Sequence, residues 1–446
     1  MSILHAMYSG VSGIQAEGEA LGVVGDNISN TNTVGFKAQR AIFQDVLGHS
    51  ISAGTSSALP GSGVRMSDVQ QMFTQGSLSN TGVATDLALS GDGFFVMKGS
   101  LSGVTGNFYT RNGQWKIDKD GFMGNTDGLK AQGYAALPNG TFSAAVSSIQ
   151  VPTAAIMPNA TKVLTVTANL DSNAVVPTAA WNAQNPSATS NFSTSISLFD
   201  SLGNAHTVDV YFRKTAAGAW DWHALAKSSE VTTPAPTVPA TDVNTQIGGG
   251  SMTFTSSGAL QSLTPNPPTT VATTFVGAAA QTITADFGSA ITPPVTVPVT
   301  VAGSGLDGIT QFAGASNVSS QQQDGYASGS LSGIGVDGTG VVRGMYTNGQ
   351  QLAIGQLAIA KFQANESLGR AGNNMWIESR ESGNAALGTA GSGGRGAVSA
   401  GALESSNVDI AQQFVDLIAH QRAFEANSKT ITTADEMLQT LQNIKR

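Results

Sequence analysis

The chain contains no cysteine, and this absence excludes several kinds of site. Disulfide bridges and thiolate-bound metals both need cysteine side chains, so neither can stabilise this protein. The five histidines are scattered along the chain without the spacing of a metal site. We therefore expect no metal and no cofactor.

Charged residues are also scarce. Only 11% of the 446 residues are charged, and the formal net charge is −8. Proteins that bind nucleic acid or anionic membranes normally carry clustered basic residues, so we expect neither partner. No apolar run reaches the roughly 18 residues that cross a bilayer, so membrane insertion is not expected. The opening residues, MSILHAMYSG, lack the basic region and apolar core of a secretory signal peptide.

Motifs for catalysis are weak. Residues 391–396 contain a GxGxxG pattern, but no βαβ unit is predicted around it, so we interpret it as a linker. Three aspartates in residues 118–127 lack the spacing of a calcium loop and are better explained by a turn. No GxSxG motif lies near a histidine. We expect that the protein is not an enzyme and has no catalytic residues.

The two ends of the chain carry matched heptad patterns. An apolar residue every seventh position indicates a helix that buries one stripe against another helix. The amino-terminal positions are Met7, Val11, Ile14, Leu21 and Ile28. The carboxy-terminal positions are Ile410, Phe414, Leu417, Phe424, Ile431 and Leu438.

Neither helix can bury its stripe alone, and apolar surface removed from water gains roughly 25 cal/mol per Å². We therefore predict that residues 1–30 and 408–446 form one helical domain, whose stripes contact each other or other copies of the chain. Gly18, Gly22 and Gly25 lie on a neighbouring face of the first helix. They indicate either close approach of another helix or a marginal helix that orders only when packed.

Between the helices, 53 glycines and many small polar residues indicate turn-rich β-structure. We predict an irregular extended arm over residues 31–75, a discontinuous β-domain over 76–150 and 322–400, and an inserted outer β-domain over 151–321. Residues 231–300 are rich in Thr, Pro, Ala and Val, which is compatible with disorder, but their β-branched content favours folded strands. The predicted fold is a mainly β multidomain protein with nested discontinuous domains and a terminal helical coiled-coil domain.

Two local predictions follow from the strand patterns. Residues 87–89 and 93–97 read as strands that pair across a short turn. Residues 195–199 and 207–211 read as strands flanking a turn at 200–204.

Both ends of the chain resemble one protein family. Residues 27–37, NISNTNTVGFK, resemble the signature of the axial proteins of the bacterial flagellum, which are the rod and hook subunits. The signature positions are Asn27, Asn30, Thr33, Gly35, Phe36 and Lys37. The far end is similar to the carboxy-terminal segment of that family, above all ALESSNVD at residues 402–409 and QRAFEANSKTI at 421–431.

The middle of the chain distinguishes between family members. Distal rod subunits lack a large inserted outer domain, whereas this chain has one. Residues 108–121 and 198–215 are similar to segments of hook proteins. The chain is therefore identified as a member of the hook proteins, with a distal rod subunit or a secreted β-rich adhesin as alternatives.

The resemblance implies a function. Hook subunits leave the cell through the flagellar type III export apparatus and polymerise into a curved tube around the export channel. That tube acts as a universal joint, which transmits torque from the basal-body rod to the filament. The implied partners are other copies of the chain, the rod, the hook cap, the hook-filament junction proteins and the export apparatus. The implied location is extracellular, in the hook of the flagellum.

Overall fold

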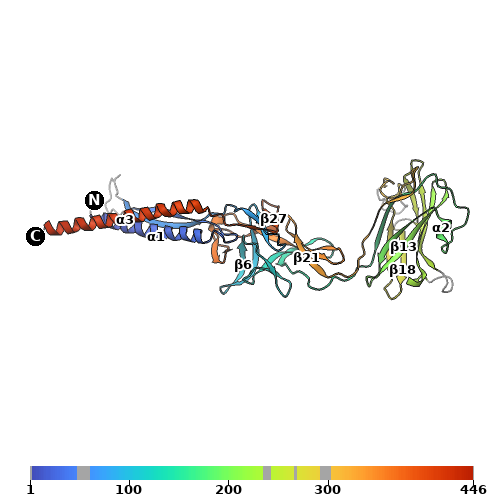
Figure 1. The fold of residues 1–446 in the computed structure, drawn as a ribbon, viewed down its shortest axis with the longest axis horizontal. Coiled ribbons are helices and arrows are strands. Elements are labelled where there is room, and N and C mark those ends of the chain that lie inside the picture. Colours follow the sequence, from blue (N-terminus) through green and yellow to red (C-terminus); the bar gives the residue numbers. More distant parts are fainter. Residues whose placement is uncertain (1–2, 48–60, 235–242, 266–268, 292–302, 445–446) are drawn as a thin grey trace. The chain divides into compact units, whose positions relative to one another are not determined.

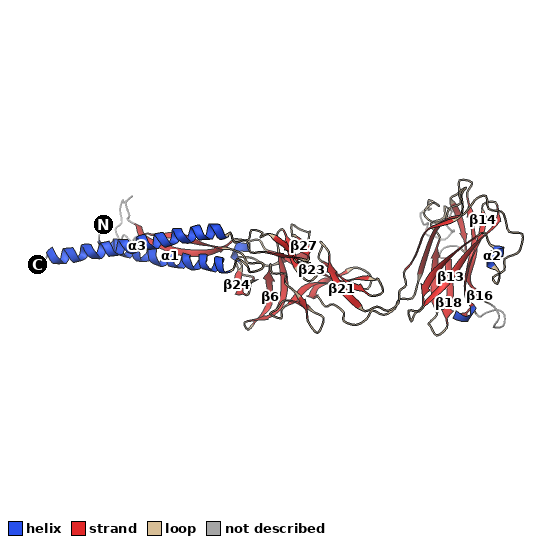
Figure 2. Ribbon diagram, in the orientation of Figure 1, coloured by secondary structure: helices blue, strands red, loops and turns tan. Residues whose placement is uncertain are grey.

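The computed structural model describes residues 3–47, 61–234, 243–265, 269–291 and 303–444. The chain divides into two compact units. The terminal unit comprises Met1–Thr153, Ser332–Met345 and Gln351–Arg446, and the inserted unit comprises Ala154–Leu331 and Tyr346–Gln350. This nested chain path and the predominance of strands confirm the predicted fold class (Figures 1 and 2).

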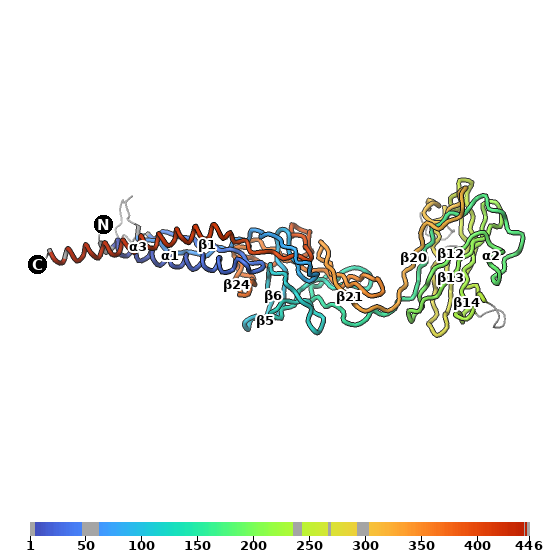
Figure 3. Tube along the Cα trace, viewed as in Figure 1, coloured from blue at the N-terminus to red at the C-terminus, as the bar shows by residue number. Residues whose placement is uncertain are grey.

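The terminal unit contains the two long helices, α1 (Ile3–Ser29) and α3 (Ile410–Ile444). They lie side by side although they come from opposite ends of the chain (Figure 3). Asp409 begins α3, because its carboxylate accepts hydrogen bonds from the backbone N–H groups of Ala411 (2.9 Å) and Gln412 (3.2 Å). The terminal helices expected from the heptads are therefore present and adjacent.

The segment after α1 differs from the prediction. Part of the arm expected over residues 31–75 is an antiparallel hairpin of β1 (Gln39–Leu47) and β2 (Gly61–Gln71), which packs along α1. Gly63 permits the close contact, since an added Cβ would lie 2.0 Å from the Ser12 hydroxyl oxygen. That same hydroxyl accepts a hydrogen bond from the N–H of Val64 at 3.2 Å. Residues 48–60 of the predicted arm lie outside the described residues.

The β-structure of the terminal unit mixes strands from before and after the inserted unit. In the twelve-stranded sheet, the long strand β23 pairs with both β5 and β9. Its strands are β5 (Phe94–Leu101), β6 (Val104–Thr110), β7 (Lys116–Ile117), β8 (Met123–Gly124), β9 (Lys130–Ala136), β10 (Phe142–Ser148), β21 (Leu331–Val336), β22 (Val341–Tyr346), β23 (Gln351–Lys361), β24 (Gly369–Gly372), β25 (Met375–Ile377) and β26 (Ala386–Thr389). The short 3₁₀ helix η2 (Asn365–Ser367) follows β23.

Two further strand pairs join the ends of the chain. β4 (Leu87–Ser90) pairs with β27 (Ala397–Ala400), and β3 (Leu78–Asn80) pairs with β28 (Ala402–Glu404). The predicted pairing of residues 87–89 with 93–97 is therefore wrong, although both segments are strands. Gly91 and Gly93 have φ angles of +108° and +120°, so the chain turns sharply between β4 and β5 and sends them to different partners.

The described residues of the inserted unit form two five-stranded sheets. One contains β11 (Val163–Asn169), β15 (Val231–Thr233), β18 (Thr269–Phe275), β19 (Gln281–Asp286) and β20 (Asn317–Gln323). The other contains β12 (Phe192–Phe199), β13 (Ala205–Ala216), β14 (Ala219–Lys227), β16 (Asn244–Phe254) and β17 (Leu260–Thr264). Two short helices, α2 (Pro186–Thr189) and η1 (Ser228–Glu230), lie in its connections.

The two sheets share a core built around Phe212, Trp220, Trp222 and Phe287. The predicted turn at residues 200–204 connects β12 and β13 as expected. Residues 231–300 contribute β15 to β19, which confirms folded strands in the described part of that segment. Burial of large side chains from both sheets explains how a segment poor in charge folds rather than remaining disordered.

Candidate functional site

The face that α1 buries differs from its heptad stripe. The buried positions of α1 are mostly small: Gly10, Gly13, Ala16, Ala20, Val24 and Asn27. A Cβ added to Gly13 would lie 2.6 Å from the side-chain nitrogen of Asn427 in α3, and one added to Gly10 would lie 3.0 Å from Cγ1 of Ile431. Small residues therefore let α3 approach α1 closely. Of the predicted stripe residues, Ile431 lies in this seam.

Two polar pairs fix the register of the helices. The His420 Nδ1 lies 2.6 Å from the Glu17 carboxylate, and the Asn27 amide donates to Oε1 of Gln413 at 2.9 Å. Because hydrogen bonds need specific partners, they favour one alignment of α1 and α3 over a slipped one.

The predicted stripe itself is only partly covered within the described residues. Among its residues, Val11, Ile410, Phe414 and Phe424 are exposed, and Met7, Ile14, Leu21, Ile28, Leu417, Ile431 and Leu438 are partly buried. Phe414 is 52% exposed, and its neighbours on α3, Val415 and Ile418, are 60% and 52% exposed. A run of large apolar side chains on one helix is typical of a surface that other protein covers.

The glycines singled out on α1 also face open space. Within the described residues, no heavy atom would come within 4 Å of a Cβ added to Gly18, Gly22 or Gly25. The close helix approach inside the chain occurs at Gly10 and Gly13 instead.

The signature residues 27–37 form the junction between α1 and the β-structure. The Asn27 amide pairs with the backbone of Gln39 in both directions, donating to its C=O at 2.7 Å and accepting from its N–H at 2.9 Å. Asn30 bonds back to the C=O of Asp26 at 2.9 Å and accepts from the Thr33 hydroxyl at 3.0 Å. These bonds satisfy backbone groups that the end of a helix leaves free.

Gly35 and Phe36 complete this turn. Gly35 has a φ of +70°, and an added Cβ would lie 2.7 Å from the carbonyl carbon of Arg111, so only glycine fits. Its N–H donates to the backbone C=O of Glu404 at 2.7 Å. Phe36 is buried.

Lys37 belongs to a buried ion-pair cluster that joins three distant segments. Its ammonium lies 2.6 Å from Oε1 of Glu404, and Nη1 of Arg111 lies 3.1 Å from Oε2. The side chains of Lys37 and Glu404 are fully buried, and that of Arg111 nearly so. Burial lowers the pKa of Lys37, while the charge of Glu404 acts in the opposite direction.

Backbone groups surround the same cluster. The N–H of Gly76 donates to Oε1 of Glu404 at 3.0 Å, Lys37 donates to the C=O of Thr74 at 2.8 Å, and Arg111 donates to the C=O of Gly91 at 2.8 Å. Such a cluster costs desolvation energy, but the loss of one member costs more because it strands a buried charge. We call Lys37, Arg111 and Glu404 the junction cluster.

Asn407 adds a second connection just before α3. Its side-chain oxygen accepts from the N–H of Ala38 at 2.7 Å, and its nitrogen donates to the C=O of Met72 at 2.8 Å. Both chain ends are therefore fastened to the same β-structure. Sequence reasoning identified the segments that carry Glu404 and Asn407 by resemblance, but it did not assign them or Arg111 a role.

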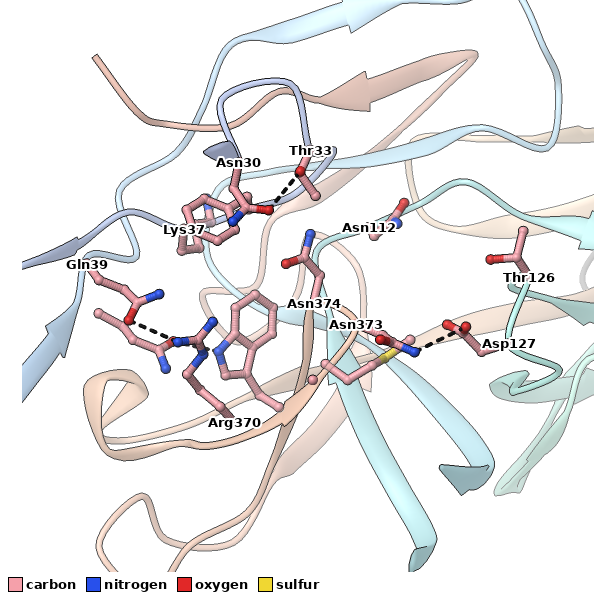
Figure 4. Close-up of a pocket in the computed structure, with 15 residues that line it drawn as sticks. Asn30, Thr33, Lys37, Gln39, Asn112, Thr126, Asp127, Arg370, Asn373 and Asn374 are labelled. Carbon is pink, nitrogen blue, oxygen red and sulfur yellow. Dashed lines mark hydrogen bonds between the residues drawn. The ribbon is translucent and has the colours of Figure 1, made fainter. Parts of the chain in front are cut away.

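A polar cavity of about 380 Å³ lies beside the junction cluster (Figure 4). Side chains of the signature, of β24 and of the turn before β25 line it. Arg370 donates to Oε1 of Gln39 at 2.9 Å, and the Asn373 amide donates to Asp127 at 3.2 Å. Asn373 and Asn374 both have positive φ angles, 52° and 55°, as in a tight hairpin turn. The cavity's polar groups are thus largely engaged in holding the junction together.

Comparison with known proteins identifies the family. The chain matches four family models: Flagella basal body rod protein at residues 7–37, Flagellar hook protein FlgE/F/G D1 domain at 88–169, Flagellar basal body protein FlaE D2 domain at 169–326, and Flagellar basal body rod FlgEFG protein C-terminal at 399–444. The flagellar hook protein FlgE of Salmonella typhimurium is 34% identical over 438 residues, covering 98% of each chain. The chain belongs to the flagellar hook protein family.

Other hook proteins match equally fully. That of Escherichia coli is 33% identical over 446 residues, covering 99% of this chain and 100% of its own. That of Treponema pallidum is 33% identical over 480 residues and is covered entirely. Because these matches include the inserted unit, the alternatives of a distal rod subunit and an adhesin are set aside. The chain is a structural subunit of the bacterial flagellar hook.

The matched models correspond to the parts described above. The rod-protein model covers most of α1 and the signature, and the carboxy-terminal model covers β28 and α3. The junction cluster draws one residue from each of three models, since Lys37, Arg111 and Glu404 lie in the rod, D1 and carboxy-terminal regions. Three separately matched regions of the chain therefore contact one another at the junction cluster.

The remaining sequence motifs occupy turns of the hook-family fold. The carboxylate of Asp118 accepts from the N–H groups of Asp120 (2.9 Å) and Phe122 (2.8 Å). Residues 391–396 form the turn between β26 and β27. Within the described residues, no three potential ligands are grouped to hold a metal, and no helix is long and apolar enough to cross a membrane.

Proposed function

We propose that this hook subunit polymerises through the exposed apolar faces of its two terminal helices. The proposed interface comprises Met7, Val11, Ile14, Leu21, Ile28, Ile410, Phe414, Leu417, Phe424, Ile431 and Leu438. Of these, Ile431 also lies beside Gly10 in the seam within the chain. The exposure of Phe414 and its neighbours on α3 carries the proposal. Fully burying one such side chain gains about 1.5–3 kcal/mol, so half-exposed residues gain about 1 kcal/mol each when another copy covers them.

The terminal helices would form an inner tube around the export channel. Contacts between different surfaces of identical subunits build an open helical polymer rather than a closed ring. In this arrangement the domains proposed from the sequence form layers: residues 1–30 and 408–446 inside, 76–150 and 322–400 around them, and 151–321 outermost. The junction cluster supports this role because it fastens both helices to the same β-structure.

The polymer would act as a curved universal joint that carries torque from rod to filament. The outer part of the chain is poor in charge, since Asp242 and Asp286 are the only charged residues between 231 and 300. Uncharged surfaces with small polar side chains make weak contacts that can slide as the joint bends. We further propose an extracellular location, export through the type III apparatus, and contacts with the rod, hook cap and hook-filament junction proteins.

Electron microscopy tests the proposal. We expect the purified full-length chain to form tubes, whereas a chain lacking residues 1–30 and 408–446 remains monomeric. Circular dichroism of the shortened chain should still report folded β-structure. Tubes formed by the shortened chain would contradict a helix-driven polymer.

A further inference from the structure

The inserted unit contains a buried lysine that has no acidic partner among the described residues. Lys214, on β13, is 7% exposed. Its ammonium donates to the backbone C=O groups of Ser172 (2.6 Å) and Ala174 (2.9 Å). Among the described residues of this unit, the ion pairs involve His206 and Lys227 but not Lys214. An ammonium has three N–H donors, and the described part of the chain supplies acceptors for two of them.

The surroundings of this lysine form an open groove. Lys214 and Ser172 both line it, and its volume is about 540 Å³. Ser256 and Gln311 also line the groove, and the side chains of Ser172, Ser256 and Gln311 have no hydrogen-bond partner within the described part of the chain. Phe312, which is 46% exposed, provides an apolar wall.

A buried charge without a counter-charge is costly, and the cost falls when an anion binds beside it. We propose that this groove binds a carboxylate carried on an apolar group. Lys214 would pair with the carboxylate, the hydroxyls and the Gln311 amide would donate to its oxygens, and the apolar group would lie against Phe312.

The chemistry of the groove favours a carboxylate over other anions. One lysine balances one negative charge, whereas a doubly charged phosphate would leave an excess negative charge in a largely uncharged pocket. The aromatic wall adds apolar contact that inorganic anions cannot use. An acidic side chain of another copy and a free organic acid share this chemistry.

Equilibrium dialysis with radiolabelled benzoate tests the site on the full-length chain. We expect saturable binding that weakens at least tenfold in Lys214→Met and is unchanged in Lys227→Met, which removes a lysine whose side chain is 65% exposed. Benzyl alcohol, which has the ring without the charge, should bind at least tenfold more weakly than benzoate. Equal binding of benzoate to wild-type protein and Lys214→Met would overturn the proposal, as would equal binding of benzoate and benzyl alcohol.

A second variant guards against misfolding of Lys214→Met. Phe312→Ala changes an exposed side chain and keeps the lysine, and we expect benzoate affinity to fall by about threefold, as for the loss of part of an apolar contact. An unchanged affinity for benzoate in Phe312→Ala would contradict the proposed contact between Phe312 and the apolar group of the ligand.

The source of the natural carboxylate is tested by sedimentation. If an acidic side chain of another copy fills the groove, saturating benzoate should increase the fraction of unassembled wild-type chain but not that of Lys214→Met. An unchanged fraction in wild-type protein would assign the groove to a free organic acid. Dialysis carried out on unassembled chain does not need tubes, so a chain that fails to polymerise would still test this site.

Discussion

Replacing Glu404 with glutamine should loosen both terminal helices from the β-structure. The carboxylate accepts from Lys37 (2.6 Å) and from the N–H of Gly76 (3.0 Å) through one oxygen, and from Arg111 (3.1 Å) through the other. Glutamine keeps the shape but turns an NH₂ group toward a cationic donor and leaves two buried cations without a counter-charge. Removing one member of a buried ion pair typically costs about 3–5 kcal/mol.

Amide hydrogen exchange measured by mass spectrometry shows which part of the chain loses this stabilising free energy. Each 1.4 kcal/mol is a factor of ten. The expected loss therefore makes exchange in α1, α3 and β28 about 140-fold to 3,700-fold faster where opening of this region limits exchange. Peptides of the inserted unit should exchange as in the wild-type chain, because Lys37, Gly76 and Arg111, which bind the Glu404 carboxylate, all belong to the terminal unit.

Two further variants sharpen this test. Glu425→Gln removes an exposed carboxylate on α3 and should leave exchange unchanged. Lys37→Met should cost less than Glu404→Gln, because Glu404 keeps Arg111 as a partner. Exchange in Glu404→Gln within threefold of wild type would refute the view that the junction cluster fastens the helices.

The other predictions concern the helix seam and the inserted unit. Gly13→Leu should destabilise the helix pair by about 1–3 kcal/mol through overpacking against Asn427, whereas Gly22→Leu, where nothing lies within 4 Å, should gain up to about 1 kcal/mol of helix propensity. Thermal unfolding followed by circular dichroism at the helix band distinguishes them, and equal effects would contradict the seam. Burial alone would raise the pKa of Asp200, but hydrogen bonds from Asn204 and other groups hold it below its ordinary value. Its stabilising effect is therefore present above the ordinary carboxyl pKa and lost as the pH falls through the lower folded value. Asp200→Asn should cost about 1–3 kcal/mol at neutral pH and reduce the acid sensitivity of the inserted unit in tryptophan fluorescence, and an unchanged acid titration would exclude this role.

The heptad pattern predicted the helices well but not the surface that they bury inside the chain. An apolar stripe is usually the inward face of a helix. Here α1 turns its small residues, such as Gly13 and Ala20, toward the buried face, because close approach of α3 and of the β1–β2 hairpin needs little side-chain volume. The large apolar residues that define the heptad pattern are left partly or fully exposed. A single sequence cannot distinguish such an exposed stripe from a buried one.

Long-range pairing was the hardest feature to predict. Residues 87–89 and 93–97 were correctly predicted as strands, yet β4 pairs with β27 rather than with the adjacent β5. The junction cluster was missed for the same reason, since Lys37 and Glu404 are 367 residues apart. In the sequence, Lys37 and Glu404 are marked only as charged residues within two short segments, 27–37 and 402–409, that resemble family signatures. The inserted unit was easier, because its β12–β13 hairpin depends on a local turn.

The composition of the chain did not indicate the pairing of β1 (residues 39–47) with β2 (residues 61–71). Glycine and serine residues in this part of the chain indicate an irregular segment, but the close packing of Gly63 against Ser12 requires a small residue at that point. Glycine there reflects contact with α1 rather than lack of structure.

Electron microscopy of two double variants tests the central claim most directly. Phe414→Asp with Ile418→Asp places charges on the exposed apolar face of α3, whereas Gln421→Asp with Thr430→Asp places the same charges at exposed polar positions of that helix. The account predicts tubes from the second variant and only dissociated, folded subunits from the first. Tubes of normal appearance from Phe414→Asp with Ile418→Asp would contradict assembly through the helix faces.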